Sequence, residues 1–488
     1  MSRTDPGVTT RALRYAPLAI AIAAVAIAAP DTRFDPHHFS APPLRPLQVP
    51  TPDRTVLPNG TVVFLLEDHR LPVVSGTAYF PSSPSLIADG QVGIEELTGD
   101  AMRRGGTATH PGDALDDRLA ALGATISTSL DAELGYAGLR CQSEDVDEVV
   151  GLFADLLQHP AFPDRKLELA KLSLHQQVAS RNDEILPIAD RLARVAVHGE
   201  HSPWARIPEH ATVDAVDTAA CRDLCARVFV PERMVLAFYG DFRTADLKKR
   251  LTAAFAGWRP SGTPAPRFPA VADRVRPRLL FAQKDDVTQS VLLVTGPGLR
   301  VDAPDAAAMD VVEQALGRGG QSRLDRHIRT QRGLAYSTGA AAGEEYLRPG
   351  EFMAWSLTRN DSALTALGLL RQELRGISQA PLDSEEFLAA KQSVENQLVF
   401  NFEQRSAVLF RAAYYEVLGY PADFLARYQR SLAAVTREAT FAAARARIQP
   451  DNMAVVVVGN AKQFERTLQS VGLPVTKVDI RIPPGPKH

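Results

Sequence analysis

The hydrophobic and polar positions of this chain alternate with two periods, one typical of strands and one typical of amphipathic helices. In the first half, patterns that favour strands occupy residues 61–66, 73–80, 124–130, 134–141 and 234–239. Helical patterns occupy residues 93–104, 113–122, 145–157 and 164–181. The first strand follows a Pro-Asn-Gly turn, and the third and fourth flank Asp131, which predicts an antiparallel pair. Mixed strands and helices of this kind predict an α+β domain.

The second half of the chain repeats the first. We expect strands at 290–295, 335–341, 350–358 and 453–458, and helices at 306–316 and 322–329. The segment 101–106 recurs as 315–320, which is 214 residues later, and the segment 231–241 recurs as 450–460, which is 219 residues later. Each half has the size of one ordinary domain, about 200 residues. The sequence therefore predicts two homologous α+β halves.

Composition excludes several classes of protein. The chain has 488 residues, of which 45% are hydrophobic, so it can bury more than one core. Its net charge is -3 and it has no block of Lys and Arg, which argues against nucleic acid as a partner.

Three cysteines cannot form a complete disulfide framework. Cys221 and Cys225 lie four apart on a predicted helix; a redox or metal pair is one interpretation, but two small apolar helix residues are favoured because no other Cys/His cluster lies nearby.

The N-terminus has the pattern of a targeting segment. Arg3, Arg11 and Arg14 precede an apolar run at 16–29, which is shorter than the about 20 residues that a membrane-spanning helix needs. Small residues at 26–28 have the spacing that signal peptidase uses. We therefore expect an exported protein, periplasmic or secreted, with an uncleaved membrane anchor as the alternative.

These patterns divide the chain into five parts. We expect a signal peptide or anchor at 1–29, a linker with seven prolines at 30–52, a first α+β domain at 53–257, a Pro-rich linker at 258–274 and a second α+β domain at 275–488.

One predicted helix resembles a zinc-binding helix whose ligands are missing. Residues 93–107 read Gly-Ile-Glu-Glu-Leu-Thr-Gly-Asp-Ala-Met-Arg-Arg-Gly-Gly-Thr. This frame resembles the inverted zinc helix of the pitrilysin/insulinase metallopeptidases, in which a Gly-Leu start leads into His-x-x-Glu-His and a Gly-Thr pair closes the helix. The resemblance places Glu96 and Asp100 at the two His positions and Gly99 at the Glu position. A further Glu ligand of the family corresponds to Gln176, beside Gln177.

These replacements predict that the chain holds no zinc. Zinc needs imidazole or thiolate donors, with a carboxylate to activate water, and Gln is a poor ligand. Glu96 and Asp100 could instead hold a hard cation, but Mg or Ca needs more oxygen ligands than this pair supplies. A solvated acidic helix face is the favoured interpretation. His198 and His201 have the wrong spacing for a helical two-His site, and we expect them in a surface turn.

The resemblance extends from about residue 51 to the end of the chain. It includes the Leu-Pro-Asn-Gly opening at 57–60, Gln289 within 284–290, and the segments 316–324 and 329–337. It implies a clamshell of two homologous α+β halves, each an antiparallel-rich sheet packed with helices, like the subunits of the mitochondrial processing peptidase. Active assemblies of the family have four such halves, in one chain or two.

A second motif of the family is intact. Arg329 and Tyr336 lie seven positions apart, as do an Arg and a Tyr that, in the family, reach across the clamshell to the substrate. A guanidinium and a Tyr hydroxyl can donate hydrogen bonds to a scissile carbonyl and its developing oxyanion. Arg332 could compete for the Arg role, but its spacing is wrong. The alternative is that Tyr336 packs under the sheet while Arg329 is an ordinary surface residue.

Glycines before this motif allow two interpretations. The segment 317–320 reads Gly-Arg-Gly-Gly but lacks the Lys-Ser/Thr of a phosphate-binding P-loop. The resemblance places Gly319 and Gly320 beside the substrate path. The alternative, a tight turn that needs positive φ, is favoured by the matching Gly105 and Gly106 of the first half.

Together these observations predict the zinc-less subunit of a two-chain peptidase. The chain would have no cofactor of its own, and a homologous subunit with His-x-x-Glu-His would hold the zinc while both bind peptide substrates. A non-catalytic structural or peptide-binding scaffold subunit is the alternative. An independently active enzyme would need an unknown metal or nucleophile, and is the least favoured.

Overall fold

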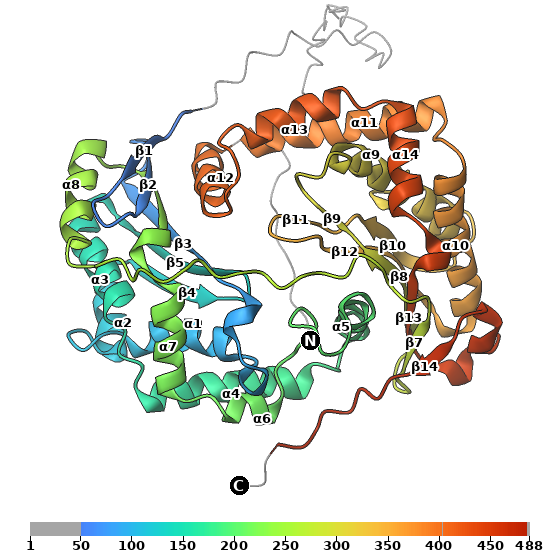
Figure 1. The fold of residues 1–488 in the computed structure, drawn as a ribbon, viewed down its shortest axis with the longest axis horizontal. Helices are drawn as coiled ribbons and strands as arrows, with labels where there is room; N and C mark the ends of the chain where they lie inside the picture. The colour runs from blue at the N-terminus through green and yellow to red at the C-terminus, as the bar shows by residue number, and fades with distance from the viewer. Residues whose placement is uncertain (1–49, 403, 486–488) are drawn as a thin grey trace, which may run out of the picture. The chain divides into compact units, whose positions relative to one another are not determined.

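Two six-stranded sheets, one in each half, form the framework of the chain in a computed structural model that describes residues 50–402 and 404–485 (Figure 1). The first sheet has the order β1-β2-β6-β3-β5-β4 and the second β10-β12-β8-β13-β7-β14. Read from opposite ends, the two orders correspond at five of the six positions, with β6 matching β13 and β3 matching β8. The outermost position differs, because β1 precedes β2 and runs antiparallel to it, whereas β14 follows β13 and runs parallel to β7. The predicted α+β class and the two similar halves are confirmed.

The first half contains six strands and eight α-helices. The strands are β1 Asp53–Val56, β2 Val62–Glu67, β3 Val73–Pro81, β4 Thr125–Leu130, β5 Leu134–Gln142 and β6 Val235–Gly240. The helices are α1 Ile94–Gly105, α2 Gly112–Ala121, α3 Val146–Gln158, α4 Asp164–Ser180, α5 Ile185–His198, α6 His210–Asp214, α7 Thr218–Val228 and α8 Thr244–Ala254.

The second half repeats this order with local changes. Its strands are β7 Leu279–Gln283, β8 Gln289–Pro297, β9 Leu299–Arg300, β10 Ala335–Ala341, β11 Glu344–Glu345, β12 Glu351–Arg359, β13 Ala454–Gly459 and β14 Val475–Lys477. Its helices are α9 Ala306–Gly317, the π-helix η5 Asp325–Thr330, α10 Ala363–Gln379, α11 Ser384–Val399, α12 Arg405–Val417, α13 Phe424–Ala433 and α14 Arg437–Arg447. The strands β9 and β11 form a separate two-stranded sheet.

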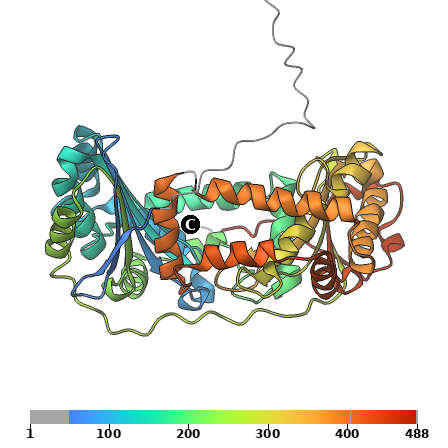
Figure 2. The ribbon, with the colours of Figure 1, turned by 90° about the horizontal axis from the view of Figure 1, so that it is seen from above.

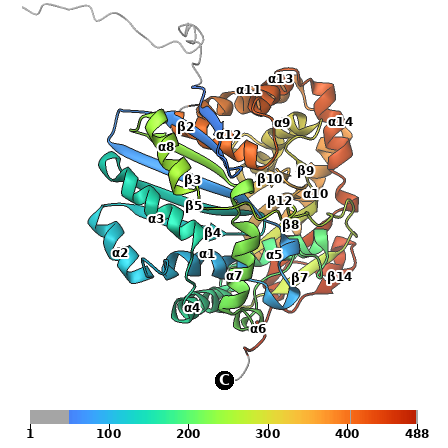
Figure 3. The same ribbon diagram turned by 60° about the vertical axis from the view of Figure 1, so that its left-hand side comes forward.

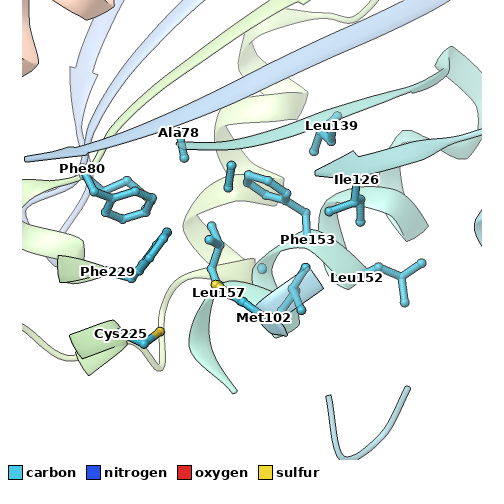
Figure 4. Packing of buried hydrophobic residues seen from close by; sticks show 14 of the residues in the cluster. Ala78, Phe80, Met102, Ile126, Leu139, Leu152, Phe153, Leu157, Cys225 and Phe229 are labelled. Atoms are coloured by element: carbon cyan, nitrogen blue, oxygen red, sulfur yellow. The ribbon is translucent and has the colours of Figure 1, made fainter. Parts of the chain in front are cut away.

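The central strands β6 and β13 are apolar at nearly every position because both faces of each sheet are covered. Along β6, Leu236 and Phe238 face the core formed with the first half's own helices, whereas Val235 and Ala237 face a second cluster. The core between the first sheet and the helices of its own half contains Phe80, Phe153 and Phe229 (Figure 4). Because successive side chains of a strand point to opposite faces, each sheet contributes side chains to two cores.

The second face of each sheet is covered by a helix from the other half (Figures 1 and 3). Helix α5 belongs to the first repeat, but its apolar stripe packs on β8 and β13 of the second sheet. Helix α12 belongs to the second repeat and packs on β2, β3 and β6 of the first sheet, where Leu409 and Ala413 are fully buried (Figure 2). The two halves therefore each complete the hydrophobic core of the other.

The predicted elements begin and end within a residue or two of those observed, but three expectations need comment. His198 is not in a surface turn: it is the last residue of α5, its side chain is 1% exposed, and Nε2 makes a short hydrogen bond to Glu351 of β12. The helix expected at 322–329 is a π-helix over Asp325–Thr330. The crossing of α5 and α12 to the opposite sheets was not predicted, because periodicity shows an apolar face but not what covers it.

Some expectations concern residues outside the described part of the chain. The predicted signal peptide at 1–29 and nearly all of the linker at 30–52 lie there. Within residues 50–402 and 404–485, no helix is both long and apolar enough to cross a membrane. Cys221 and Cys225 are buried, unbridged residues of α7, as expected for small apolar helix residues.

A cluster of buried carboxyl groups lies in the second half. Asp310 and Glu313 of α9 are 7% and 4% exposed. Glu344 of β11 lies close enough to both for electrostatic repulsion between the carboxylates. Arg318 Nε lies 2.5 Å from Glu313 Oε1, and the Tyr428 hydroxyl donates to Asp310. One buried oxygen of Glu344 has no hydrogen-bond partner. Burial, followed by repulsion from Asp310 and Glu313, raises the pKa of Glu344 to about 9.

We expect Glu344→Gln to stabilise the protein above neutral pH. The folded pKa exceeds the ordinary 4.5, so the native carboxyl stabilises the fold fully below pH 4.5 and loses that contribution as pH rises towards 9. Glutamine mimics the protonated group at every pH. In urea denaturation at pH 8, the free energy of unfolding of the variant should exceed that of the unaltered protein by several kcal/mol, since each pH unit above 4.5 costs the native carboxyl about 1.4 kcal/mol. Near pH 4.5 the two values should match. Glu200→Gln, at an exposed glutamate, should change neither value.

Candidate functional site

Helix α1, which resembles the zinc helix, is held against the first sheet by its apolar face. Leu97, Ala101 and Met102 are at most 1% exposed, and α1 packs on β4, α4 and α7. The helix begins after Gly93, whose φ is +101°, a conformation that favours glycine. Glu96 is exposed and Asp100 is half-buried, one turn apart on the side away from the core.

Gly99, which the resemblance aligns with the Glu of His-x-x-Glu-His, lies directly against β4. A Cβ added to it would be 2.5 Å from the main-chain nitrogen of Leu130 and 2.8 Å from Cα of Ser129. The Thr128 hydroxyl donates to the Gly99 carbonyl at 2.6 Å and fixes this close approach. The space that a general base would need is therefore filled by the backbone of an edge strand.

Gln177, the neighbour of the predicted Gln176, contacts this group. Both glutamines are exposed, but Gln177 Nε2 donates to Glu96 Oε1 at 2.7 Å, and Gln176 does not line the pocket beside α1. Arg104 Nε donates to Asp100 Oδ1, also at 2.7 Å. The pocket has a volume of about 310 Å³ and is lined by α1, β4 and α4. Both carboxylates are thus engaged by hydrogen-bond donors.

The residues present do not fit a zinc ion. Glu96 and Asp100 are the ionisable groups at the ligand positions, and the third group is an amide whose N–H₂ already faces Glu96. No imidazole or thiolate lies among them, and Gly99 leaves no carboxylate to activate water. Across residues 50–402 and 404–485, no group of three or more His, Cys, Asp or Glu side chains is arranged to hold a metal.

We expect Gly99→Ala to destabilise the protein by about 2–4 kcal/mol, since the added methyl group must displace β4. Gly151→Ala is the matched control, because Gly151 is an exposed helical residue of α3 with open space at its Cβ position. That change should stabilise by about 0.5–1 kcal/mol through helix propensity. Urea denaturation measures both. Equal effects of the two changes would contradict the close packing at Gly99.

Arg329 lies on the π-helix Asp325–Thr330, and its side chain is 54% exposed. Its Nη1 lies 3.0 Å from Asp325 Oδ2, which leaves the other N–H groups of the guanidinium available. The competing Arg332 donates to the main-chain oxygen of His327 at 2.7 Å and is occupied in the turn. π-Helical turns are rare and frequently occur at functional sites.

Tyr336 lies on β10, the edge strand of the second sheet, and is 76% exposed. The register between β10 and β12 shifts between Ala335 and Ser337, so Tyr336 is the bulged residue. A bulge re-aims one side chain of a strand. Tyr336 therefore does not pack under the sheet, which was the alternative to a functional role. Both members of the pair project from irregular backbone towards solvent.

The glycine segment before η5 forms part of a separate pocket of about 490 Å³ between the 318–322 loop and α11. Gly319 has a φ of +81°, as expected for a tight turn, and both Gly319 and Gly320 have open space around them. Arg329 and Tyr336 do not line this pocket. The two glycines and the Arg/Tyr pair therefore do not line the same pocket.

The acidic cluster of the second half was missed by sequence reasoning, although the repeat contains the signal. A shift of 214 residues places Asp310, Glu313 and Gln314 opposite Glu96, Gly99 and Asp100. The packing of the two helices is repeated as well, although the hydrogen bonds join different positions: Gln397 of α11 donates to Gln314 of α9 at 3.1 Å, and Gln177 of α4 donates to Glu96 of α1.

Comparison with known proteins places both halves in one family. Residues 100–201 match the model described as insulinase (peptidase family M16), and residues 216–394 match the model described as peptidase M16 inactive domain. The non-peptidase homolog YmxG of Helicobacter pylori is 24% identical over 375 residues, covering 73% of this chain and 82% of that protein. The uncharacterized zinc protease YmxG of Bacillus subtilis is 20% identical over 317 residues, covering 64% and 75%.

A solved structure gives the same fold. The crystal structure of a peptidase M16 inactive domain from Pseudomonas fluorescens superposes with a TM-score of 0.75 and 21% identity, covering 84% of this chain and 98% of that one. Since both halves match models of one family and the fold agrees, the chain belongs to the insulinase (M16) peptidase family, as a homologue whose zinc-binding helix lacks its metal ligands.

Proposed function

We propose that this chain is the zinc-less subunit of a two-subunit peptidase and acts on peptides bound at a zinc site of its partner. The observation that supports it most is the contrast between two sites. At the zinc positions of α1, Glu96 accepts a hydrogen bond from Gln177 and Asp100 accepts one from Arg104. Arg329 and Tyr336, in contrast, keep the family spacing and are exposed on a π-helix and a bulge.

The proposed role of Arg329 and Tyr336 is electrostatic. A guanidinium and a phenol hydroxyl donate hydrogen bonds to the peptide carbonyl and hold the negative charge that develops on its oxygen. Neither residue needs a metal of its own for this role. The partner would supply the zinc, the general base and the other half of the chamber, with Gly319 and Gly320 contributing to the peptide path.

The partner is expected to be a homologous chain with an intact His-x-x-Glu-His. Co-expression of this chain with such a subunit from the same genome, followed by affinity purification through a tag on one chain, tests the assembly. Stoichiometric co-purification is expected. Recovery of this chain alone, at concentrations where both are folded, would contradict the proposal.

A second candidate function is a peptide-binding scaffold without a catalytic role. A pocket of about 600 Å³ shares Glu96 and Leu130 with the smaller pocket beside α1, so the two adjoin. It extends past the β4–β5 turn to Trp204, and Arg348 of the second half stacks on that ring with its guanidinium carbon 4.4 Å from the ring centroid. This groove could hold an extended peptide even if Arg329 and Tyr336 play no part in cleavage.

We also propose that the protein is exported. The basic residues, short apolar run and small residues of the first 29 positions support this. N-terminal sequencing of the native protein should recover a start near Ala29. A start before Ala16 would reject cleavage and favour an anchor.

A further inference from the structure

Asp325, the first residue of the π-helix, is a buried acidic side chain that the proposed function leaves without a role. The residue is 8% exposed. Its Oδ2 lies 3.0 Å from Arg329 Nη1, and its Oδ1 accepts a hydrogen bond from the Thr330 hydroxyl at 3.1 Å. Both carboxylate oxygens are therefore occupied by neighbours on the same turn.

The wide turn of the π-helix explains how one carboxylate serves two partners. In an α-helix, a residue faces the one four positions later. In this segment the main-chain N–H of Gln331 donates to the carbonyl of Arg326, five residues earlier, so the turn contains an extra residue. Positions four and five after Asp325 both lie against it, and they are Arg329 and Thr330.

We propose that Asp325 is a positioning residue for Arg329, an inference that rests on the proposed role of the Arg/Tyr pair. A long, exposed arginine samples many rotamers, whereas a guanidinium anchored at one nitrogen keeps its plane and direction. Asp325 is buried and fixed by Thr330, so it anchors Nη1 and leaves the other N–H groups directed to solvent. Charge favours the same arrangement, since a buried carboxylate needs a cationic partner.

The first test measures the anchoring in the purified chain, without any partner. Phenylglyoxal modifies accessible guanidinium groups, and peptide mass spectrometry gives the modification rate of Arg329. We expect Asp325→Asn to raise this rate severalfold and Asp325→Glu to raise it less. The matched control is Asp423→Asn at the residue before α13, where Asp423 also pairs with an arginine four residues later, Arg427, at 2.7 Å. It should leave the Arg329 rate unchanged.

The second test measures catalysis in the complex with a His-x-x-Glu-His partner, using a fluorogenic peptide that this complex cleaves. Asp325→Asn should lower kcat by about tenfold to a hundredfold with little change in KM, and Asp325→Glu should restore part of it. Adding Asp325→Asn to Arg329→Lys should lower kcat no further. Thr330→Val, which keeps the Arg329 contact, should have a smaller effect than Asp325→Asn.

The two tests separate the failure of this inference from the failure of the proposed function. If Arg329→Lys and Tyr336→Phe complexes keep full activity, the proposed catalytic role is wrong, and the modification rate alone then decides whether Asp325 anchors Arg329. An unchanged rate in both Asp325→Asn and Asp325→Glu overturns the inference. A raised rate with additive losses of kcat in the double variant also overturns it, because the two residues then act independently.

Discussion

Replacing Tyr336 by Phe should reduce peptide cleavage by the proposed two-subunit complex about 10²–10³-fold while leaving assembly intact. The change removes one hydroxyl from a side chain that is 76% exposed, so no packing is lost. Loss of one oxyanion donor typically costs about 2.7–4 kcal/mol of transition-state stabilisation. Arg329→Lys keeps the charge but loses the planar fork, and should cause a loss in the same direction.

Cleavage and co-purification are measured separately for each variant. Arg427→Lys is the matched control, since Arg427 is an exposed helical arginine that also pairs with an aspartate four residues earlier. It should keep full activity. Full activity in both Tyr336→Phe and Arg329→Lys, with assembly intact, would show that the pair is structural and would favour the scaffold function.

Replacing Ile188 by Asp should unfold the second sheet before the first, although Ile188 belongs to the first repeat. Ile188 of α5 is 0% exposed and packs in the cluster that covers β8 and β13. A buried, unpaired carboxylate at this point should cost about 3–5 kcal/mol. Native-state hydrogen exchange should therefore accelerate in β8 and β13 more than in β2 and β6.

Leu186→Asp, two residues earlier on the same helix, is the control. Leu186 is 47% exposed, so the change should have little effect on either sheet. If Ile188→Asp accelerated exchange chiefly in the first sheet, α5 would belong to its own half in solution and the observed crossing of helices would be wrong.

The sequence predicted where the helices and strands lie better than it predicted which of them pack against one another. The continuous apolar run of β13 required cover on both faces, but it could not show that the cover on one face is α5, which precedes it by more than half the length of the chain. His198 illustrates the consequence. Its polar neighbours at 199–202 indicated a surface turn, yet the helix places its ring against Glu351 of the other half.

The parts of the candidate site that depend on spacing along the chain could be predicted. The parts that depend on tertiary contacts could not. The spacing of Glu96 and Asp100 on a helix, and the seven-residue interval from Arg329 to Tyr336, could be read from the sequence. The bulge that exposes Tyr336 and the π-turn that pairs Asp325 with Arg329 could not, because both are departures from regular backbone. The contact between Gln177 and Glu96 could not be predicted either, because it depends on which side of α4 packs towards α1.

The proposed division of labour between two subunits is tested most directly by measuring zinc content and peptide cleavage for this chain alone, the partner alone and the mixture. We expect no stoichiometric zinc and no cleavage for this chain alone, one zinc per pair in the complex, and cleavage that needs both chains. One tightly bound zinc on this chain alone, together with cleavage that does not need the partner, would contradict the account.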